Sequence, residues 1–376
     1  MRVILVNKRF PPNRSATGYH GYGLAQYLHS VGHTIHLIST HGSQSSQEPI
    51  DGIFHHRIKS LYDGKSIMLR LIFTLIDSYR LIRRAKKTKG TRYIIMSDPP
   101  FLQFIATFLL PSERTIFWMM DLYPEAFIAK GLIRRETSLI RWYKNRLQKF
   151  NPLVVLALGD HQKKYITSEY AYRSTVSIPV GLQDSNLSDH IDRPRWYTDQ
   201  SKIYFGYFGN LGEAHDVLFL EQFITQLDSK KHHMILSCQG SKAQRLLQYC
   251  GHLNTVSIVE QQELDQIAFI DVHIVTLINS WTHTCVPSKA LLALQVGGAV
   301  LFNGSEKSDT WQYVKSAGWR IESNERTEKS IRHFLEVLEC TQLTKRKKIA
   351  QTIAQELKEQ LSNAYNTIAQ DIDDKK

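Results

Sequence analysis

Short runs of apolar, β-branched residues alternate with helix-like segments along most of this chain, and this alternation restricts its fold more than any other feature. Residues 2–6, RVILV, predict a strand that is buried on both faces. A loop with Pro11-Pro12 follows, apolar side chains then recur at helical spacing over residues 19–31 up to a capping Gly32, and residues 34–39 predict another strand. Strand, loop, helix and strand in this order form a βαβ unit, so we expect a parallel sheet with right-handed crossovers.

The same alternation restarts after Pro179, which predicts a second domain built like the first. The predicted fold class is therefore α/β, with two Rossmann-like domains that face a cleft, residues 1–180 and 181–350, followed by a C-terminal helix, residues 351–376. Ligands of such sheets bind beyond the carboxyl ends of the strands, so the loops that follow strands are the places to search for a site. The further predicted strands are residues 93–96, 115–119, 153–158, 203–208, 234–238, 256–259, 272–277 and 299–302, and residues 344–371 are predicted to be helical and polar.

The positive charge of the chain is concentrated in its first half. The 376 residues carry a formal net charge of +12, but residues 1–180 carry +15 and residues 181–376 carry −3. A change of sign between halves indicates that one domain faces an anionic partner, which is nucleic acid, anionic lipid or a phosphorylated substrate. Hydrophobic residues make up 42% of the chain and charged residues 22%, which excludes a disordered protein.

Two segments of the first half carry much of this charge. Residues 65–92 have nine basic side chains and one acidic one, and residues 130–149 have seven basic and one acidic. Apolar and aromatic residues are interleaved with them, as in a surface that lies on an anionic membrane. The alternative is a pair of ordinary amphipathic helices whose apolar faces pack on the sheet, and both interpretations can hold together. No aromatic-rich recognition motif accompanies the charge, so a nucleic-acid partner is disfavoured.

The sequence predicts a cytoplasmic protein. If its anionic partner is a membrane, we expect the protein to bind peripherally to the inner face of the plasma membrane. No stretch approaches the roughly 18 apolar residues that a spanning helix needs. The apolar part of residues 1–7 is too short for a signal peptide. The four cysteines show no C-x-x-C spacing and are expected to be reduced thiols.

Three residues of the first half lie on candidate site loops. Gly18 stands where a loop meets a helix N-terminus, whose unpaired N–H groups and dipole favour a phosphate; a tight turn that needs glycine is the alternative. The loop is not G-x-G-x-x-G, so a nicotinamide dinucleotide site is disfavoured. Asp98 and Asp121 each follow a predicted strand, where a carboxylate acts either as a general base or as a simple cap or solvated group.

The second half offers a corresponding set of residues. Gly209 and Asn210 follow its first strand, and Asn210 is able to hydrogen-bond a phosphate. Ser288 is predicted to cap a helix over residues 290–296, with Lys289 in the first turn, where a cation opposes the helix dipole. This placement indicates that Lys289 meets an anion. No Gly-rich run precedes the lysine, which excludes a P-loop ATPase. No Cys/His cluster and no D-x-D motif at a strand end indicates a metal or cofactor.

Taken in series, these loops resemble the GT-B glycosyltransferases, specifically glycosyltransferase family 4. The similar stretches, in the expected order, are RVILVNKRFPPNRSATG, LAQYLHSVGHTIHLIS, IIMSDPPFL, FWMMDLYPEAFIAKG, VLALGD, YFGNLGEAHD and VPSKALLALQVGGAVLF. The D-L-Y-P-E and P-S-K segments are most similar to a bacterial branch that builds surface polysaccharides. The resemblance implies a metal-independent enzyme that moves a sugar from a nucleotide-sugar, expected to be UDP-linked, to a lipid-linked glycan or polysaccharide acceptor. It also implies that the C-terminal helix returns to the N-terminal domain.

Carried onto this sequence residue by residue, the resemblance implies where the donor binds. Gly18 would lie by the donor phosphates and the transferred sugar, and Asp121 would take the place where many relatives have a histidine near the reacting sugar. The other implied donor contacts are Gly209 and Asn210 at the pyrophosphate, Val259 within residues 256–260 at the nucleotide base, and Ser288 and Lys289 at the phosphates.

The sequence departs from the family pattern in two places. Thr284 and Leu292 stand where many members have two glutamates separated by seven residues, and Asn210 and His215 replace the usual Arg/Lys pair beside the pyrophosphate. Lys289 is then the clearest donor cation. These departures keep two further hypotheses open, a GT-B sugar-nucleotide epimerase and a non-catalytic subunit that supports a partner glycosyltransferase. A catalytic base at Asp98 or Asp121 would suit inversion, whereas the family resemblance leans towards retention.

Overall fold

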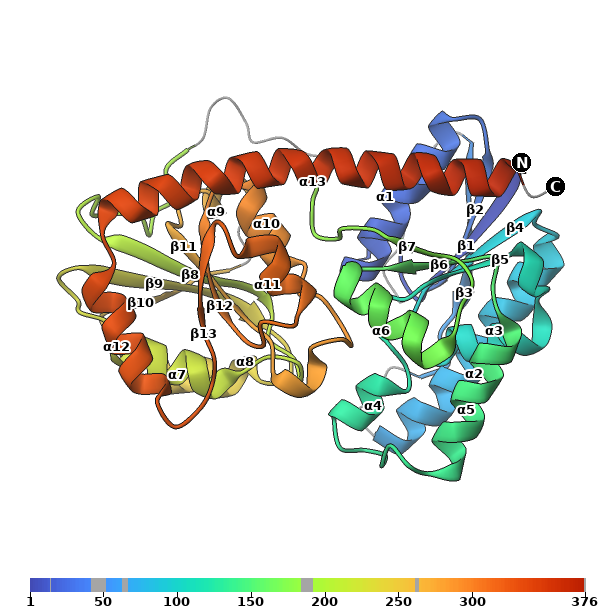
Figure 1. The fold of residues 1–376 in the computed structure, drawn as a ribbon, viewed down its shortest axis with the longest axis horizontal. Coiled ribbons are helices and arrows are strands. Elements are labelled where there is room, and N and C mark those ends of the chain that lie inside the picture. Colours follow the sequence, from blue (N-terminus) through green and yellow to red (C-terminus); the bar gives the residue numbers. More distant parts are fainter. Residues whose placement is uncertain (14, 42–51, 63–66, 184–191, 261–263, 375–376) are drawn as a thin grey trace. The chain divides into compact units, whose positions relative to one another are not determined.

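The computed structural model describes residues 1–13, 15–41, 52–62, 67–183, 192–260 and 264–374, excluding the side chains of residues 41, 67, 68 and 70. These residues form two compact units, each built on a parallel sheet with helices on both faces (Figure 1). The predicted α/β class with two Rossmann-like domains is confirmed. Lys65, where the first basic segment begins, lies outside the described residues.

The first unit contains a seven-stranded parallel sheet in the order β3-β2-β1-β4-β5-β6-β7. The central strands are buried because helices cover both faces of the sheet, which is why they are continuous apolar runs in the sequence. The strand order reverses between β1 and β4, and α/β sheets bind ligands at the carboxyl ends of the strands beside such a reversal. The strands are β1 (Arg2–Val6), β2 (Thr34–His41), β3 (Ile53–Lys59), β4 (Arg92–Ile95), β5 (Thr115–Trp118), β6 (Val154–Ala157) and β7 (Thr175–Ser177).

Helices α2, α3, α5 and α6 form the main core of this unit against one face of the sheet. Aromatic rings fill much of it; the ring of Phe104 stacks on Tyr143 at 4.2 Å and that of Phe117 on Phe150 at 5.3 Å. Helix α1 packs on the sheet through Leu24 and Leu28. The helices are α1 (Ala16–Ser30), α2 (Ile67–Thr88), α3 (Leu102–Leu109), η1 (Ser112–Arg114), α4 (Glu125–Ala129), α5 (Ser138–Phe150) and α6 (Asp160–Tyr170).

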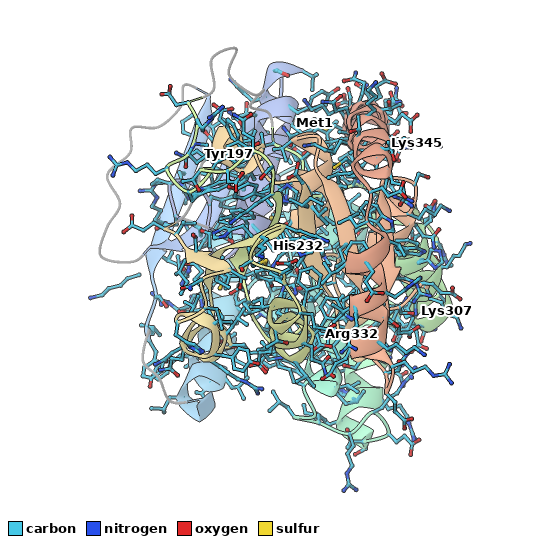
Figure 2. All side chains as sticks on the ribbon, turned by 90° about the vertical axis from the view of Figure 1, so that its left-hand side faces the viewer. Met1, Tyr197, His232, Lys307, Arg332 and Lys345 are labelled. Atoms are coloured by element: carbon cyan, nitrogen blue, oxygen red, sulfur yellow. The ribbon has the colours of Figure 1, made fainter. Side chains whose placement is uncertain are left out.

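The second unit contains a six-stranded parallel sheet in the order β10-β9-β8-β11-β12-β13, so its order reverses between β8 and β11. Exposed charges such as Lys307, Arg332 and Lys345 project outward, whereas His232 on β9 is buried (Figure 2). The strands are β8 (Ile203–Asn210), β9 (His232–Gln239), β10 (Val256–Ile258), β11 (Val272–Thr276), β12 (Ala299–Asn303) and β13 (Gly318–Ile321). The helices are α7 (Val217–Thr225), α8 (Ala243–Cys250), α9 (Leu264–Ile267), η2 (Asn279–Trp281), α10 (Lys289–Gln295), α11 (Asp309–Val314), α12 (Thr327–Val337) and α13 (Cys340–Asp374).

The sequence does not predict β3, β7 or β13, and each of these strands lies at the edge of its sheet. An edge strand is partly solvated and does not need a continuous apolar run. Strand β3 reads IFHHRIK and is mostly half-buried or exposed, while β7 is only three residues long. Apolar runs in the sequence therefore predicted the interior strands but not the edge strands β3, β7 and β13.

Helix α13 links the two units in the sequence. It is one continuous helix that begins at Cys340, shortly before residue 344, where helical structure was predicted to begin, and before residue 351, the predicted start of the separate C-terminal helix. No Gly or Pro interrupts residues 340–374. The chain from Gln360 onward belongs to the first unit, as expected for a helix that returns to the N-terminal domain. There the Tyr27 ring lies 5.4 Å from that of Tyr365, and its hydroxyl donates to Asn366.

The two units are not consecutive stretches of chain. The first comprises Met1–Pro179, His283–Cys285 and the end of α13, and the second comprises Val180–Thr282 and Val286–Glu359. A backbone hydrogen bond explains why the short segment His283–Cys285 belongs to the first unit. The Leu122 N–H donates to the Thr284 carbonyl at 3.0 Å. The ring of His283 also stacks on that of Tyr165 at 5.1 Å.

Candidate functional site

The first candidate site lies at the carboxyl ends of β1, β4 and β5. Asp98 follows β4, and its carbonyl accepts the Lys8 backbone N–H at 2.6 Å, which joins the loops after β1 and β4. Asp121 follows β5, and its N–H donates to Ser97 Oγ at 3.0 Å. These bonds bring both predicted catalytic residues to one edge of the sheet, beside the reversal of strand order.

The carboxyl groups of Asp98 and Asp121 influence each other electrostatically. Burial raises the pKa of Asp121 to about 6, and the like charge of Asp98 adds to the rise. Burial also raises the pKa of Asp98, against the opposing effect of the Lys8 and Arg9 cations. A carboxyl group with a pKa near 6 is mostly ionised at neutral pH yet accepts a proton readily, as a general base must.

Gly18 lies inside α1 and not in a turn before it. Its N–H donates to Ser15 Oγ at 3.2 Å, so Ser15 caps the helix and the expectation of an unpaired N–H at Gly18 is wrong. A Cβ at this position would stand 2.1 Å from the Arg9 carbonyl oxygen. Glycine is therefore required because the loop after β1 passes close to the helix, while a place beside the donor sugar stays a prediction.

A buried ion-pair network supports the loop that carries Asp121. The Tyr170 hydroxyl lies 2.9 and 2.8 Å from the two carboxylate oxygens of Glu125, the first residue of α4. Lys144 Nζ lies 2.9 Å from the same carboxylate and 2.7 Å from that of Glu169. The network thus ties α4, α5 and α6 together directly after Asp121.

Replacing Tyr170 by phenylalanine is expected to lower the free energy of unfolding by about 2 kcal/mol, because a hydrogen bond to a charged group contributes roughly 1.5–3 kcal/mol. The ring keeps its packing, but the buried carboxylate of Glu125 loses a donor. Urea unfolding followed by circular dichroism measures the difference.

Tyr172 provides the matched control. Its ring stacks on that of Tyr170 at 5.5 Å, and its buried hydroxyl has no hydrogen-bond partner within the described part of the chain. Tyr172→Phe should leave stability unchanged or slightly raise it, since no bond is lost. Equal losses in the two variants would contradict the role given to the bond between Tyr170 and Glu125.

The second candidate site lies at the carboxyl ends of β8 and β11, where the order of the second sheet reverses. Lys289, the first residue of α10, reaches across the end of β8. Its Nζ donates to the Tyr207 hydroxyl at 2.6 Å and to the Asn210 carbonyl at 2.9 Å, and it lies 3.9 Å from the centroid of the Tyr207 ring. These two contacts orient the ammonium group at the end of β8.

His215 lies in the loop after β8 and is buried. Its Nδ1 lies 2.6 Å from the carbonyl oxygen of Thr276, the last residue of β11, so this nitrogen donates the bond. Burial, and then the charge of Lys289, hold the pKa of His215 well below its ordinary value. His215 is therefore neutral, and it joins the β8 loop to β11 without supplying the cation that its position in the family pattern usually carries.

The remaining predicted donor residues lie along the same edge of the second sheet. Gly209 has a φ of +92°, which residues with a side chain rarely adopt, and Asn210 directly follows it at the end of β8. Val259 follows β10, with β9 between that strand and β8, and its N–H donates to the Leu236 carbonyl at 2.9 Å.

Ser288 does not cap α10, so that prediction is wrong. Its backbone has helical angles, with φ −56° and ψ −26°, and its side chain makes no capping bond. A capping side chain reaches the N–H groups from an extended backbone. The turn begins one residue earlier, where the Pro287 carbonyl accepts the Ala290 N–H at 3.0 Å.

The positions that carry glutamates in many family members are apolar or buried here. Thr284 is buried and belongs to the first unit. Leu292 lines a small pocket of the second unit together with His273 and Lys289. Neither side chain supplies a carboxylate.

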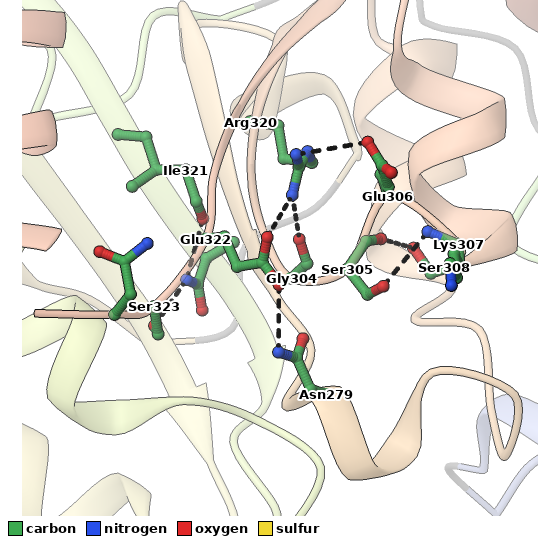
Figure 3. Close-up of polar contacts among 12 residues, drawn as sticks. Asn279, Gly304, Ser305, Glu306, Lys307, Ser308, Arg320, Ile321, Glu322 and Ser323 are labelled. Atoms are coloured by element: carbon green, nitrogen blue, oxygen red, sulfur yellow. Dashed lines mark hydrogen bonds and ion pairs between the residues drawn. The ribbon is translucent and has the colours of Figure 1, made fainter. Parts of the chain in front are cut away.

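A separate polar network lies at the ends of β12 and β13 (Figure 3). Arg320 donates to Glu322 Oε2 at 3.0 Å and to the Gly304 carbonyl at 3.2 Å, and it lies 3.6 Å from a Glu306 carboxylate oxygen. The other Glu322 oxygen accepts from Asn279 Nδ2 at 3.2 Å. Two carboxylates thus balance the charge of Arg320, which disfavours it as a phosphate ligand.

Sequence reasoning missed three residues beside the two sites, Lys8, Tyr207 and Lys242. Lys8 and Lys242 come shortly after predicted strands, so the rule that ligands bind at the carboxyl ends of strands would have found them. Tyr207 lies inside a strand, and nothing in the sequence indicates that its hydroxyl meets Lys289. Within the described ranges, no group of three or more His, Cys, Asp or Glu side chains is able to hold a metal ion.

Known proteins share the fold of this chain. No family model and no curated protein matches its sequence. WaaG, a glycosyltransferase involved in lipopolysaccharide biosynthesis, is similar with a TM-score of 0.71 and 15% identity over 99% of each chain. Sucrose-phosphate synthase from Thermosynechococcus elongatus is similar with a TM-score of 0.72 and 12% identity over 98% of each chain. Anabaena HepE in complex with UDP and glucose has a TM-score of 0.66 and 14% identity over 98% of this chain and 99% of that one.

These similarities extend over nearly the whole length of each protein. The chain therefore has the GT-B fold, as the sequence resemblance implied. At such low identities the likeness establishes the fold, and function must be argued from the residues of the two sites.

Proposed function

We propose that this chain is a metal-independent glycosyltransferase that moves a sugar from a nucleotide-sugar donor to an acceptor hydroxyl. The observation that carries the proposal is the full-length similarity of this chain to glycosyltransferase structures. One similar structure, HepE, was solved with UDP and glucose. A UDP-linked sugar is the donor we expect. In each unit a polar cluster lies at the reversal of strand order, which is where α/β proteins bind ligands.

Lys289 is proposed to stabilise the leaving group. Transfer breaks the bond between the anomeric carbon of the sugar and a phosphate oxygen, and the electron pair leaves with the nucleoside diphosphate. A cation that is already in place beside the departing phosphate lowers the barrier, because it needs no reorganisation during the reaction. Tyr207 and Asn210 hold the Lys289 ammonium group in this way before substrate binds.

Asp121 is proposed to accept the proton of the acceptor hydroxyl while the oxygen of that hydroxyl bonds to the anomeric carbon. Its raised pKa suits a base that works near neutral pH. Direct attack assisted by this base inverts the configuration at the anomeric carbon. A product that retains the donor configuration would remove Asp121 from this role.

We further propose that the acceptor is a lipid-linked glycan at an anionic membrane surface, as in bacterial surface-polysaccharide synthesis. The N-terminal half of α2 exposes an apolar stripe, whereas Leu81, Ile82 and Ala85 further along the helix are buried in the core. The exposed half of α2 supports the proposed membrane contact, and the buried half packs on the core as in an ordinary amphipathic helix. The stripe consists of Leu69, Leu71, Ile72, Leu75, Ile76 and Tyr79.

Other exposed apolar and basic side chains lie on α2 and α5 of the same unit. Leu139 and Trp142 on α5 are 58% and 53% exposed, and α3 packs against both α2 and α5. Exposed basic side chains on α2 and α5, such as Lys86 and Arg141, lie on the same helices. Apolar side chains next to basic ones fit an anionic bilayer surface, to which each basic residue contributes about 1 kcal/mol. Within the described chain, no helix is long and apolar enough to cross a membrane.

The double replacement Ile72→Glu and Ile76→Glu is expected to weaken binding to anionic vesicles at least tenfold, or roughly 1.4 kcal/mol, because it removes apolar contact and adds negative charge. Both side chains are exposed, so the fold should be unaffected. Sedimentation with vesicles of phosphatidylglycerol and phosphatidylcholine measures the bound fraction. Leu218→Glu is the control, since Leu218 is an exposed apolar residue on α7 of the second unit. Unchanged binding of the double variant would exclude the stripe as the membrane contact.

A donor screen tests the proposed activity. Purified protein is incubated with common sugar nucleotides and a bacterial membrane extract, and release of nucleoside diphosphate is measured. Release with one donor, dependent on the extract, is the expected result. No release with any donor would count against a transferase.

The replacement of the glutamate pair by Thr284 and Leu292 favours one other function, a non-catalytic subunit that supports a partner glycosyltransferase. Calorimetry with nucleoside diphosphates separates the two, because a subunit without a donor site binds none of them. Isomerised donor in the absence of acceptor would indicate a sugar-nucleotide epimerase.

A further inference from the structure

Lys242 stands out as a second cation beside the loop that follows β8. It comes after β9, directly before α8, and its side chain is half-buried. Its Nζ donates to the carbonyl of Glu213 at 3.1 Å and to that of His215 at 2.9 Å. Its backbone N–H donates to the Leu211 carbonyl at 3.1 Å. Lys242 therefore fastens the same loop whose beginning, at Asn210, holds Lys289.

The two lysines lie close to a common neighbour. The positive charges of Lys289 and Lys242 both contribute to the low pKa of His215, after the larger effect of burial. The imidazole between them is neutral, so it neither adds to their charge nor balances it. The β8 loop is thus bordered by two ammonium groups that come from separate elements, α10 and the start of α8.

Three other cations of the second unit are paired with carboxylates. Arg320 meets Glu306 and Glu322, as Figure 3 shows, Arg245 meets Glu221 and Lys347 meets Asp271. For Lys242, no carboxylate of the described residues lies within ion-pair distance of Nζ. The Glu213 carboxylate accepts from Ser241 Oγ at 2.7 Å, and only its backbone carbonyl faces the lysine.

We propose that Lys242 binds the diphosphate of the nucleotide-sugar together with Lys289, an inference that rests on the proposed function. A nucleoside diphosphate carries more than one negative charge, and two ammonium groups beside one loop match it better than one. The carbonyls of Glu213 and His215 take two of the three Nζ protons, which leaves the third to a phosphate oxygen. Lys242 thus takes over the role of the cation that is absent at Asn210 and His215.

Calorimetry on the full-length protein tests this role. UDP, GDP and ADP are each compared with the matching nucleoside, and the pair that the wild type binds is used for the variants. Lys242→Gln keeps an amide that donates to the two carbonyls but removes the charge, and Lys242→Arg keeps the charge. Lys230→Gln is the matched control, because Lys230 is exposed and precedes β9 at the opposite edge of the sheet.

Lys242→Gln should weaken nucleoside diphosphate binding about tenfold, as expected for one hydrogen bond to a charged group, while nucleoside binding stays unchanged. Lys242→Arg should retain most of the affinity, and Lys230→Gln all of it. Equal binding of the diphosphate by Lys242→Gln and wild type would overturn the proposal. An equal loss of nucleoside and diphosphate binding would also overturn it, since it would show that the lysine only fastens the loop. A wild type that binds none of the three diphosphates would instead contradict the proposed function, and this inference with it.

Discussion

Replacement of Lys289 by alanine is expected to lower kcat/KM for nucleoside diphosphate release about 100-fold, equivalent to about 2.7 kcal/mol of transition-state stabilisation. The reason is the position of the ammonium group, which Tyr207 and Asn210 hold at 2.6 and 2.9 Å beside the end of β8. Alanine removes the charge that would meet the departing phosphate. Initial rates over a range of donor concentrations measure the effect and separate kcat from KM.

Two further variants show whether charge is the cause. Lys289→Arg keeps the charge but replaces the compact ammonium group by a larger planar one. Its kcat/KM should therefore lie between those of the wild type and Lys289→Ala. Lys230→Ala, at the opposite edge of the same sheet, should behave as wild type. Unchanged kinetics of Lys289→Ala would remove this lysine from the donor site. A matching loss of folded protein, detected by circular dichroism, would assign it a structural role.

Asp121→Asn is expected to have the largest effect, a loss of about 1,000-fold in kcat, because general base catalysis contributes roughly 100- to 10,000-fold. Asparagine has nearly the same shape but does not accept a proton. Glu113→Gln is the control, since Glu113 is an exposed carboxylate that precedes β5, whereas Asp121 follows it. Full activity of Asp121→Asn would exclude Asp121 as the base.

The pH dependence of the wild type follows from the same residue. Because the pKa of Asp121 is about 6, its carboxylate is lost below that pH, and log kcat/KM should rise with pH up to about 6 and then level off. Removing the like charge of Asp98 lowers the pKa of Asp121, so Asp98→Asn should move this rise to lower pH. A rise that stays in place in Asp98→Asn would show that another group controls it.

Interior strands and loops were predictable from the sequence because their causes are local. A strand between two layers of helices must be apolar throughout, so runs such as residues 2–6 and 272–277 identify it without knowledge of its neighbours. The order of strands along the chain then indicates which loops lie at the carboxyl edge. Asp98, Asp121 and Lys289 were found in this way, and each does lie at such an edge.

The properties that decide the chemistry of the sites were not predictable, because each depends on residues far apart in the sequence. Burial, and then the charge of Lys289, keep His215 neutral, so it supplies no cation at the β8 loop. The close approach of the Arg9 carbonyl requires the glycine at position 18. Likewise, α2 exposes apolar side chains of its N-terminal half and buries Leu81, Ile82 and Ala85 of its more basic C-terminal half.

The alternation of apolar runs and helical segments along the sequence determines the α/β class and the two-domain plan. It also determines which loops lie at the carboxyl ends of the strands, where ligands of such folds bind. These follow from hydrophobic burial, which is a property of the residue pattern. The tertiary structure decides which charges remain unbalanced at those loops. Arg320 meets two carboxylates, whereas Lys242 meets only carbonyls of the β8 loop, because folding brings different partners to each. Charge states and ion pairs are contacts between distant segments, and no local pattern encodes them.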